Sequence, residues 1–330
     1  MATITSEIQD KKSPIVSVII IAYNQEKTIR QTIESVLNQK CNFFFEIIIG
    51  DDCSTDSTRE ICLEYQNKNG NIISLLFQET NQGVVKNYLD TIRLTRGKYV
   101  AQCAGDDYWN LSSKLQLQFD FLEQHENCGI VHTNCDILNV KNGKILKNYA
   151  NTSKVATEEG NLTKSIFQGK TSIFTPTVVF RKELFDKYIP QYDYINLKFP
   201  VEDWPTWVIL SKYSTIGYLP MATATYRRGH ESLSNISDYD KIEKKLSLEH
   251  IMYKYVCNLF PEDLLYNEQG YSIYINTVML SLAYKKNDYP KAKQYANALH
   301  LKKFRKLKTI CATTWVTFNF FNTMKRLVKN

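Results

Sequence analysis

The stretch from Gly105 to Trp109 holds the side chains best suited to chemistry in this sequence. Asp106 and Asp107 are adjacent acids, which repel each other unless a cation lies beside them. Their oxygens suit Mg²⁺ or Mn²⁺, Gly105 lets the backbone approach a ligand closely, and Trp109 offers a flat apolar wall. A solvated acidic turn is the alternative, because Asp and Gly are common turn residues. Taken alone, this stretch leaves the two interpretations equally weighted.

A second acidic pair, Glu202 and Asp203, and a basic pair, Arg227 and Arg228, could take part in the same reaction. A carboxylate at hydrogen-bond distance can accept the proton of an attacking hydroxyl. Cationic side chains can stabilise a leaving group. Helix capping is the alternative for the acids, and ordinary surface charge is the alternative for the arginines.

The segments around these residues alternate between strand and helix. Apolar runs that end in polar turns predict strands at residues 15–22, 43–49, 72–78 and 98–103. Helical spacing of apolar residues predicts helices at 26–39, 57–67 and 84–96, the last ended by Gly97. This alternation predicts an α/β fold with a doubly wound, mostly parallel sheet flanked by helices. Ligands bind such sheets outside the carboxyl ends of the strands, where Asn24, Asp52 and Asp107 fall.

The rest of the chain is expected to hold shorter elements and then a helical extension. Further helices are expected at residues 115–126 and 181–188 and from the Glu202-Asp203 pair to 213, and extended segments at 129–138, 173–180 and 216–226. Beyond residue 237, amphipathic helices are expected at 241–259 and 271–284. We therefore expect a tail at 1–13, a main domain at 14–235 and a helical, basic region at 236–330.

Composition disfavours several classes of protein. The chain has 330 residues, a formal net charge of +7 and 43% hydrophobic residues, which is ordinary for a globular protein. The charge is too small and too spread out to indicate a nucleic-acid partner. Eight cysteines form no CxxC pair, so we expect reduced thiols and no structural zinc. The first residues lack an apolar signal core, and no run reaches about 18 apolar residues, so a cytoplasmic location is expected.

In order and spacing, these motifs resemble the family 2 glycosyltransferases, whose domain has the GT-A nucleotide-sugar fold. The matching motifs are VIIIAYN at residues 18–24, EIIIGDDCSTD at 46–56, GKYV at 97–100, DDYW at 106–109, KL at 114–115, EDW at 202–204 and YRRGH at 226–230. The resemblance covers roughly residues 14–235. It implies a nucleotide-sugar part at about 14–110 and an acceptor part at about 111–235.

On the donor side, the resemblance assigns residues to the nucleotide and the metal. Asp52 stands where the family contacts uracil and ribose, and Lys86 stands near the nucleotide, with a solvated helix residue as its alternative. The loop beside the base would hold Ala22, Tyr23, Asn24 and Glu26. Asp107 would bind Mg²⁺ or Mn²⁺ directly, and Asp106 would reach the ribose or a bound water. His230 would touch the metal or the diphosphate, unless it is an ordinary loop histidine.

On the transfer side, the resemblance makes Asp203 the catalytic base, and a helix N-terminus there would tend to keep it ionised. Trp109, Glu202, Trp204, Arg227 and Arg228 are expected beside the diphosphate or the substrate. Core packing is the alternative for Trp109.

The expected activity is an inverting, metal-dependent, non-processive transfer from a nucleotide-sugar, expected to be a UDP-sugar. The acceptor would be a glycan or a lipid-linked glycan of a bacterial surface polysaccharide or lipopolysaccharide pathway. The Gln-x-x-Arg-Trp motif of processive members is missing after Asp203. A catalytically inactive glycan- or nucleotide-binding scaffold and a nucleotidyltransferase are the alternatives. A dinucleotide oxidoreductase is disfavoured, because no G-x-G-x-x-G motif follows the first strand.

The C-terminal stretch could contact a membrane. Residues 300–308 are strongly basic, and residues 310–321 are apolar and aromatic. Such a segment can lie on anionic headgroups, which would place the enzyme at the inner face of the cell membrane, near a lipid-linked acceptor. A helix docked on the catalytic domain is the alternative.

Overall fold

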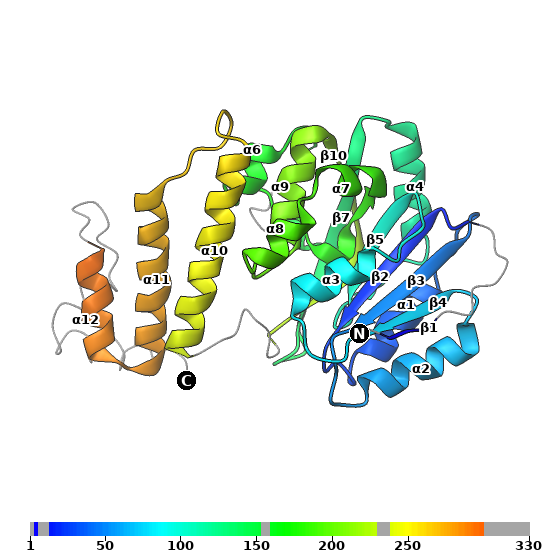
Figure 1. The fold of residues 1–330 in the computed structure, drawn as a ribbon, viewed down its shortest axis with the longest axis horizontal. Helices are drawn as coiled ribbons and strands as arrows, with labels where there is room; N and C mark the ends of the chain where they lie inside the picture. Colours follow the sequence, from blue (N-terminus) through cyan, green and yellow to red (C-terminus); the bar gives the residue numbers. More distant parts are fainter. Residues whose placement is uncertain (1–2, 6–12, 153–158, 230–237, 300–330) are drawn as a thin grey trace. The chain divides into compact units, whose positions relative to one another are not determined.

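The computed structural model describes residues 3–5, 13–152, 159–229 and 238–299 (Figure 1). The chain divides into two compact units. The first comprises residues 1–232 with 258–264, and the second comprises residues 233–257 with 265–330. His230 and residues 300–321 lie outside the described part of the chain, so the expectations that rest on them stay predictions.

A mixed β-sheet forms the centre of the first unit. Its strands in the described residues are β1 (Thr3–Thr5), β2 (Val16–Ala22), β3 (Phe45–Asp51), β4 (Ile73–Phe77), β5 (Tyr99–Ala104), β6 (Tyr108–Trp109), β7 (Cys128–Asn139), β8 (Ile145–Leu146), β9 (Val179–Arg181) and β10 (Thr215–Arg228). Their order is β1-β4-β3-β2-β5-β9-β7-β10-β6, and β8 pairs with β7. β4, β3, β2 and β5 are parallel neighbours, as are β7 and β10. β9 joins these two groups through antiparallel pairs.

Buried β-branched residues explain the central strands. β2 reads VSVIIIA and β3 reads FEIIIGD, and every residue of β3 is buried. A parallel strand covered by helices on both faces requires such a run. The register aligns Ala22 with Asp51 and Ile21 with Ala104. The loops that follow β2, β3 and β5 therefore leave the sheet side by side at one edge.

Helices cover both faces of this sheet (Figure 1). The first unit has α1 (Ile29–Leu37), α2 (Thr58–Asn69), α3 (Val84–Ile92), α4 (Lys114–Gln124), α5 (Tyr149–Thr152), α6 (Thr163–Phe167), the 3₁₀ turn η1 (Thr175–Thr177), α7 (Lys182–Tyr188), α8 (Gln191–Asn196) and α9 (Asp203–Tyr213). Residues of α1, α2 and α4 share one core with the sheet face that carries Val18 and Ile47. On the other face, Tyr88 of α3 packs against Phe185 of α7, and Trp207 of α9 packs against Phe180. The expected α/β fold is confirmed.

Several local expectations were wrong. The sheet is more mixed than expected, because β9 and β6 pair antiparallel with their neighbours. α3 ends at Ile92 rather than at Gly97. Gly97 instead allows a close approach of backbone, since a Cβ there would lie 2.6 Å from the backbone nitrogen of Ser17. Arg181 belongs to a strand, not a helix, and its buried guanidinium donates hydrogen bonds to the carbonyls of Cys128 and Leu122.

The second unit is helical in its described residues. It contains most of α10 (Tyr239–Leu259), then α11 (Glu268–Lys286) and α12 (Tyr289–Ala298). Side-chain oxygens of Asn267 and Asp288 cap α11 and α12 at their N-termini. Asn287, with φ 59°, ends α11 in the left-handed conformation. Among the described helices, none combines the length and apolar character needed to cross a membrane.

Candidate functional site

The loops that follow β2 and β3 are locked together by hydrogen bonds. Asn24 has φ 52°, and its N–H donates to Ser54 Oγ at 2.9 Å. Its side-chain Oδ1 accepts the N–H of Thr55 at 2.8 Å, and the N–H of Glu26 donates to Asp56 Oδ2 at 3.0 Å. The two loops thus form one rigid ledge. Tyr23 remains 47% exposed on it, so its ring is accessible to a planar ligand.

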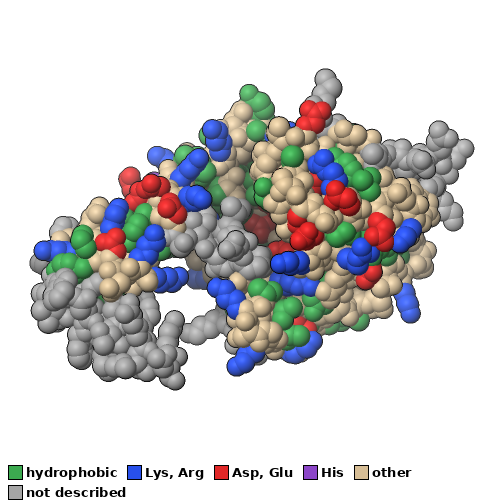
Figure 2. Space-filling model, turned by 90° about the horizontal axis from the view of Figure 1, so that it is seen from below, with side chains coloured by type: hydrophobic (Ala, Val, Ile, Leu, Met, Phe, Trp, Pro, Cys, Tyr) green, Lys and Arg blue, Asp and Glu red, His purple; other side chains and the backbone are tan. Residues whose placement is uncertain are grey.

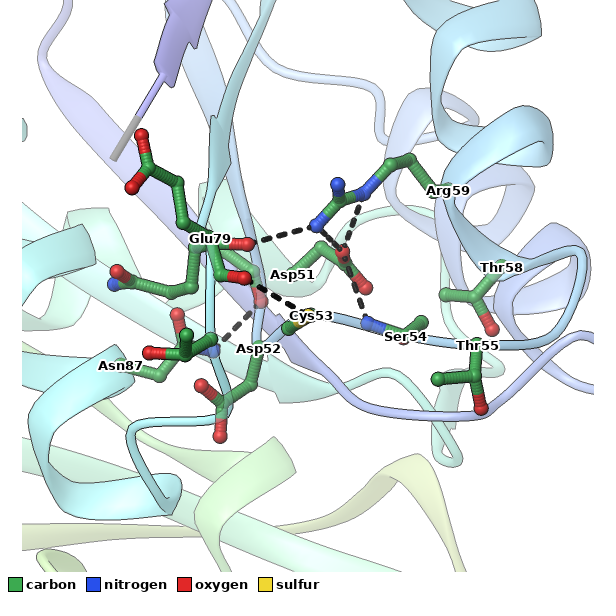
Figure 3. A network of polar contacts seen from close by, with 12 residues as sticks. Asp51, Asp52, Cys53, Ser54, Thr55, Thr58, Arg59, Glu79 and Asn87 are labelled. Carbon is green, nitrogen blue, oxygen red and sulfur yellow. Dashed lines mark hydrogen bonds and ion pairs between the residues drawn. The ribbon is translucent and has the colours of Figure 1, made fainter. Parts of the chain in front are cut away.

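Asp51 and Asp52 close the end of β3 in different ways (Figure 3). Asp51 is fully buried, and its Oδ2 accepts hydrogen bonds from Nε and Nη2 of Arg59 at 2.9 and 2.7 Å. Asp52 accepts the N–H groups of Gln82 and Gly83 at 2.7 and 2.9 Å. Burial raises the pKa of Asp52, although the two N–H groups oppose this shift. Asp51 is therefore structural, and Asp52 fixes the N-terminal end of α3 beside the ledge.

Lys86 lies in the first turn of α3 and forms an ion pair with Asp90 at 2.5 Å. Its charge also reaches Asp52 and opposes the rise in the pKa of that carboxyl. The pair with Asp90 fits the alternative of a solvated helix residue, and the proximity to Asp52 fits the expected place near the nucleotide.

The loop of Asp106 and Asp107 is held by α1. The hydroxyl of Thr32 contacts the carbonyl oxygens of Gly105 at 3.0 Å and Asp107 at 2.6 Å. Asp107 is 1% exposed, and its Oδ1 accepts the N–H of Arg227 at 2.8 Å. Burial, and then the neighbouring charge of Asp106, raise the pKa of Asp107 well above its usual range.

A divalent cation fits this acid pair. Two adjacent carboxylates offer the hard oxygen ligands that Mg²⁺ and Mn²⁺ prefer, and a cation would offset the repulsion that raises the pKa of Asp107. In the part of the chain that the structure describes, no cluster of three Asp, Glu, His or Cys side chains completes a metal cage. Mg²⁺ usually keeps several water ligands and takes further oxygens from substrate phosphates.

The two arginines of β10 differ in their surroundings. Arg227 is 7% exposed, donates to the carbonyl oxygen of Asp106 and to Gln31 Oε1, and stacks over Tyr108 with 4.8 Å to the ring centroid. Arg228 is exposed, and its guanidinium lies 5.5 Å from the ring centroid of Tyr149. The guanidinium of Arg227 braces the acidic loop in this structure, and its expected place beside the diphosphate stays a prediction.

Trp109 packs in the core, which fits its alternative, and its expected place beside the substrate stays a prediction. It is 4% exposed, belongs to the core under α1, and its indole Nε1 donates to the carbonyl oxygen of Pro176 at 2.9 Å. The ammonium of Lys114 lies 4.5 Å from the Trp109 ring centroid, and burial lowers the pKa of Lys114 to about 7. Trp109 therefore supports the acidic loop from behind instead of forming an exposed wall beside it.

Glu202 and Asp203 meet at the start of α9. Asp203 Oδ1 accepts the N–H of Trp204 at 2.7 Å, and Oδ2 accepts the hydroxyl of Thr175 at 2.9 Å. Burial raises the pKa of Asp203, and burial with the charge of Asp203 raises the pKa of Glu202 to about 8. The helix N-terminus thus does not keep this pair as acidic as expected, because the cost of desolvation is larger. The indole of Trp204 packs against Phe167.

Tyr226 shows that the two acidic pairs share one region. Burial raises its pKa to about 12, and the charges of Asp107, Asp106 and Asp203 all act in the same direction. Phe174 lies beside Tyr226, with 5.3 Å between ring centroids. Acids from the ends of β5 and α9 therefore approach a common aromatic side chain.

Four further residues that lie around the acidic loop and Asp203 were not identified from the sequence. Thr32 and Lys114 support the acidic loop, and Thr175 and Tyr226 contact or approach Asp203. Lys114 and Tyr226 belong to the motifs KL at 114–115 and YRRGH at 226–230, so the motifs themselves could have indicated that both residues lie near the site. Thr32 and Thr175 carry no sequence signal, because isolated threonines are common and their partners are distant in the chain.

A family comparison gives this geometry its context. Residues 17–189 match the model of the family described as "Glycosyl transferase family 2". The chain belongs to this family. The resemblance drawn from the motifs is confirmed at the level of the family and of the GT-A fold.

Several proteins are similar to this chain over about two thirds of its length. The putative teichuronic acid biosynthesis glycosyltransferase TuaG of Bacillus subtilis is 30% identical over 223 residues, covering 67% of this chain and 82% of the relative. WfgD of Escherichia coli, a UDP-Glc:alpha-D-GlcNAc-diphosphoundecaprenol beta-1,3-glucosyltransferase, is 26% identical, covering 67% and 80%. An uncharacterized protein of Mycobacterium tuberculosis is 31% identical over 214 residues, 64% of this chain; the match spans only 58% of that longer relative.

Two solved structures share the fold. Staphylococcus aureus TarS 1–349 in complex with UDP-GlcNAc has a TM-score of 0.55 at 20% identity, covering 92% of this chain and 82% of that one. The mannosyltransferase PcManGT from Pyrobaculum calidifontis, in complex with GDP-Man and Mn²⁺, has a TM-score of 0.50 at 14% identity, covering 96% and 88%. At these identities the likeness concerns the fold alone.

Proposed function

We propose that the protein transfers one sugar from a nucleotide-sugar to a hydroxyl of a glycan or lipid-linked glycan, with inversion at the anomeric carbon. One observation carries the proposal: the ends of β2, β3 and β5 bring Tyr23, Asp52 and Asp107 to one edge, and Tyr226 links that edge to Asp203. Ligands bind at this edge of open α/β sheets. A UDP-sugar is the expected donor, since the names of WfgD and the TarS complex both carry UDP-sugars.

The donor would lie along this edge. The ledge formed by the two locked loops offers the Tyr23 ring to the base, and Asp52 lies beside it for the ribose. Asp106 and Asp107 would hold Mg²⁺ or Mn²⁺, and the bound ion supplies positive charge that offsets the charge developing on the leaving diphosphate. The PcManGT complex with Mn²⁺ supports the choice of metal.

Asp203 would act as the general base. The acceptor hydroxyl loses its proton to the Asp203 carboxylate while its oxygen attacks the anomeric carbon, and the sugar–phosphate bond breaks with its electrons on the diphosphate. A single displacement of this kind inverts the anomeric centre. A positioned base of this type contributes about 10²–10⁴ in rate.

The acceptor follows from the relatives. TuaG is named for teichuronic acid biosynthesis, and the name of WfgD specifies a diphosphoundecaprenol acceptor. We therefore expect a surface-polysaccharide precursor as acceptor, modified at the cytoplasmic face of the membrane. On the face drawn in Figure 2, Lys and Arg side chains are interspersed with Asp and Glu, which supports a small-molecule partner over a nucleic acid.

Calorimetric titration tests the donor site. The full-length protein should bind UDP more tightly with Mn²⁺ than without it, and Asp107→Asn should lose this difference. Asp120→Asn is the control and should keep it, because this half-buried acid on α4 only accepts a hydrogen bond from Gln116. If Mn²⁺ changes the affinity of neither UDP nor GDP for the wild-type protein, the proposal of metal-dependent donor binding fails. That result would favour the alternative of a catalytically inactive scaffold. A transfer and hydrolysis screen of nucleotide-sugars then identifies the donor.

A further inference from the structure

The carboxylate of Asp203 is held at both oxygens. Thr175 Oγ1 donates to Oδ2 at 2.9 Å, and the N–H of Trp204 donates to Oδ1 at 2.7 Å. The carboxylate cannot rotate without breaking one of these bonds. Donors to a carboxylate also favour its charged form, which burial at this position disfavours. The hydroxyl of Thr175 therefore affects both the direction in which Asp203 points and its protonation.

Thr175 belongs to a turn that is itself tied down. In η1, the carbonyl oxygen of Pro176 accepts Nε1 of Trp109 at 2.9 Å, and that of Thr177 accepts Nε2 of Gln118 at 2.8 Å. Pro176 and Thr177 are both buried. Trp109 lies two residues after Asp107 in the chain. The same short turn thus contacts the segment that carries the acid pair and the residue proposed as the base.

We propose that Thr175 is a positioning residue for Asp203, and that η1 fixes the base relative to the loop of Asp106 and Asp107. This inference rests on the proposed function, because it takes Asp203 as the base. Thr175 keeps its own proton during transfer: the acceptor proton goes to Asp203, and the hydroxyl only holds the carboxylate in line before the attack. Such prior alignment lowers the barrier of the step without tightening the binding of the donor.

Other ionisable groups face Asp203, and their charges affect its titration. Glu202 precedes it at the start of α9, Tyr88 approaches from α3, and Tyr226 approaches from β10. Glu202 and Asp203 titrate as a pair. Replacing Thr175 removes a donor to Asp203 and leaves these three groups in place, so a changed titration reports on that donor.

The test compares Thr175→Val, Thr175→Ser and a control on the same turn, Thr177→Val. The Thr177 hydroxyl donates only to the carbonyl oxygen of Phe174 at 2.6 Å, so its loss removes a turn contact without touching Asp203. Carbon-13 NMR of Asp-labelled, ligand-free protein follows the carboxyl titration, and Asp203→Asn identifies the signal. We expect Thr175→Val to move the Asp203 midpoint to higher pH, while Thr175→Ser and Thr177→Val keep the wild-type midpoint.

The kinetic arm uses whichever of UDP-glucose, UDP-GlcNAc or GDP-mannose the wild-type enzyme turns over. Thr175→Val should lower kcat about tenfold or more at neutral pH with the donor KM unchanged. Thr175→Ser, which keeps the hydroxyl, should have the kcat of wild type. A folded Thr175→Val protein with wild-type midpoint and kcat would overturn the positioning role and leave Asp203 as the base. Full transfer by Asp203→Asn would instead overturn the base itself. If valine prevents folding, Thr175→Ala takes its place.

Discussion

Glu202 and Asp203 lie side by side at the start of α9, and burial raises the pKa of both. A general base has to be ionised at the working pH, and a carboxyl with a raised pKa remains a stronger base once ionised. The bonds from Thr175 and the Trp204 N–H keep Asp203 the more acidic member, since they oppose the effect of burial. Glu202 then holds the proton of the pair to about pH 8.

Replacing Asp203 separates binding from transfer. Asp203→Asn removes the proposed base but keeps the size of the side chain, so transfer should fall by about 10²–10⁴ while UDP-sugar affinity stays within about twofold of wild type. Rate assays and calorimetry measure the two quantities. Asp186→Asn, an exposed acid on α7 that pairs with Lys182, is the control and should change neither. Retained turnover in Asp203→Asn would remove Asp203 from this role.

The raised pKa of Glu202 also makes stability depend on pH. In the folded protein burial, and then the charge of Asp203, raise the pKa of this carboxyl from its usual value near 4.5 to about 8, so the native state binds the extra proton between these values. Its contribution to stability is complete below the unfolded pKa and is lost as pH rises through the folded one. The melting temperature of wild type should therefore fall between pH 5 and pH 8.5, and Glu202→Gln should reduce this fall. Glu183→Gln on the exposed surface of α7 should leave the fall unchanged; an equal fall in Glu202→Gln would contradict the assignment.

At the scale of elements, close backbone contact fixes how β5 starts beside β2. The N–H of Gly97 donates to Ser17 Oγ at 2.8 Å, and Ser17 Oγ in turn donates to Glu46 Oε1 at 2.6 Å. Arg96 pairs with the same glutamate. The segment before β5 thus has no room for a side chain at Gly97, and it sets the register that brings Asp107 to the site.

Gly97→Ala tests this contact. A Cβ would meet the Ser17 nitrogen at 2.6 Å and the Tyr99 carbonyl oxygen at 2.9 Å, so the free energy of unfolding should fall by about 1–3 kcal/mol. Gly70→Ala is the matched control. Gly70 has the right-handed helical conformation with φ −57°, and a Cβ there would lie 3.3 Å from its nearest neighbour, the carbonyl oxygen of Gln66. Urea unfolding followed by tryptophan fluorescence reports on the first unit through Trp109, Trp204 and Trp207. Equal midpoints for the two variants would refute the close contact.

The sequence predicted the parallel half of the sheet better than the rest. β2 and β3 are buried on both faces, so burial itself produces the continuous apolar runs that identify them. β9 has three residues, and its pairing of Tyr99 with Arg181 is too distant in the chain for any local pattern to reveal.

The same distinction applies to the site. The acids could be placed from the sequence, because a polar turn after a buried strand falls at the ligand-binding edge. The contacts of Arg227 and Trp109 could not be predicted from the sequence, because their partners Gln31 and Pro176 lie far away in the chain. Side-chain direction within a strand also separates Arg227 from Arg228, and a motif does not reveal which of the two is buried.

At the scale of the whole molecule, a surface-glycan acceptor requires that the enzyme reach a membrane. The C-terminal segment supplies a sequence suited to this: Lys302, Lys303, Arg305, Lys306 and Lys308 lie within nine residues, followed by Trp315, Phe318, Phe320 and Phe321. Each basic residue near an anionic surface contributes about 1 kcal/mol, and the contribution weakens within a Debye length as salt is added. Binding through this segment should therefore depend on both lipid charge and salt.

Vesicle flotation tests that dependence. The full chain should float with vesicles that contain anionic lipid at low salt, and much less with neutral vesicles or at 0.5 M salt, an ionic strength at which the Debye length falls to roughly 4 Å. A chain truncated after Leu299 keeps α12 whole and should stay at the bottom of the gradient. A full-length variant with the five basic residues changed to Gln separates charge from the aromatic stretch, and it should lose the salt-sensitive part of binding. If the truncated chain floats as well as the full chain, the segment does not recruit the enzyme, and docking on the protein itself becomes its better explanation.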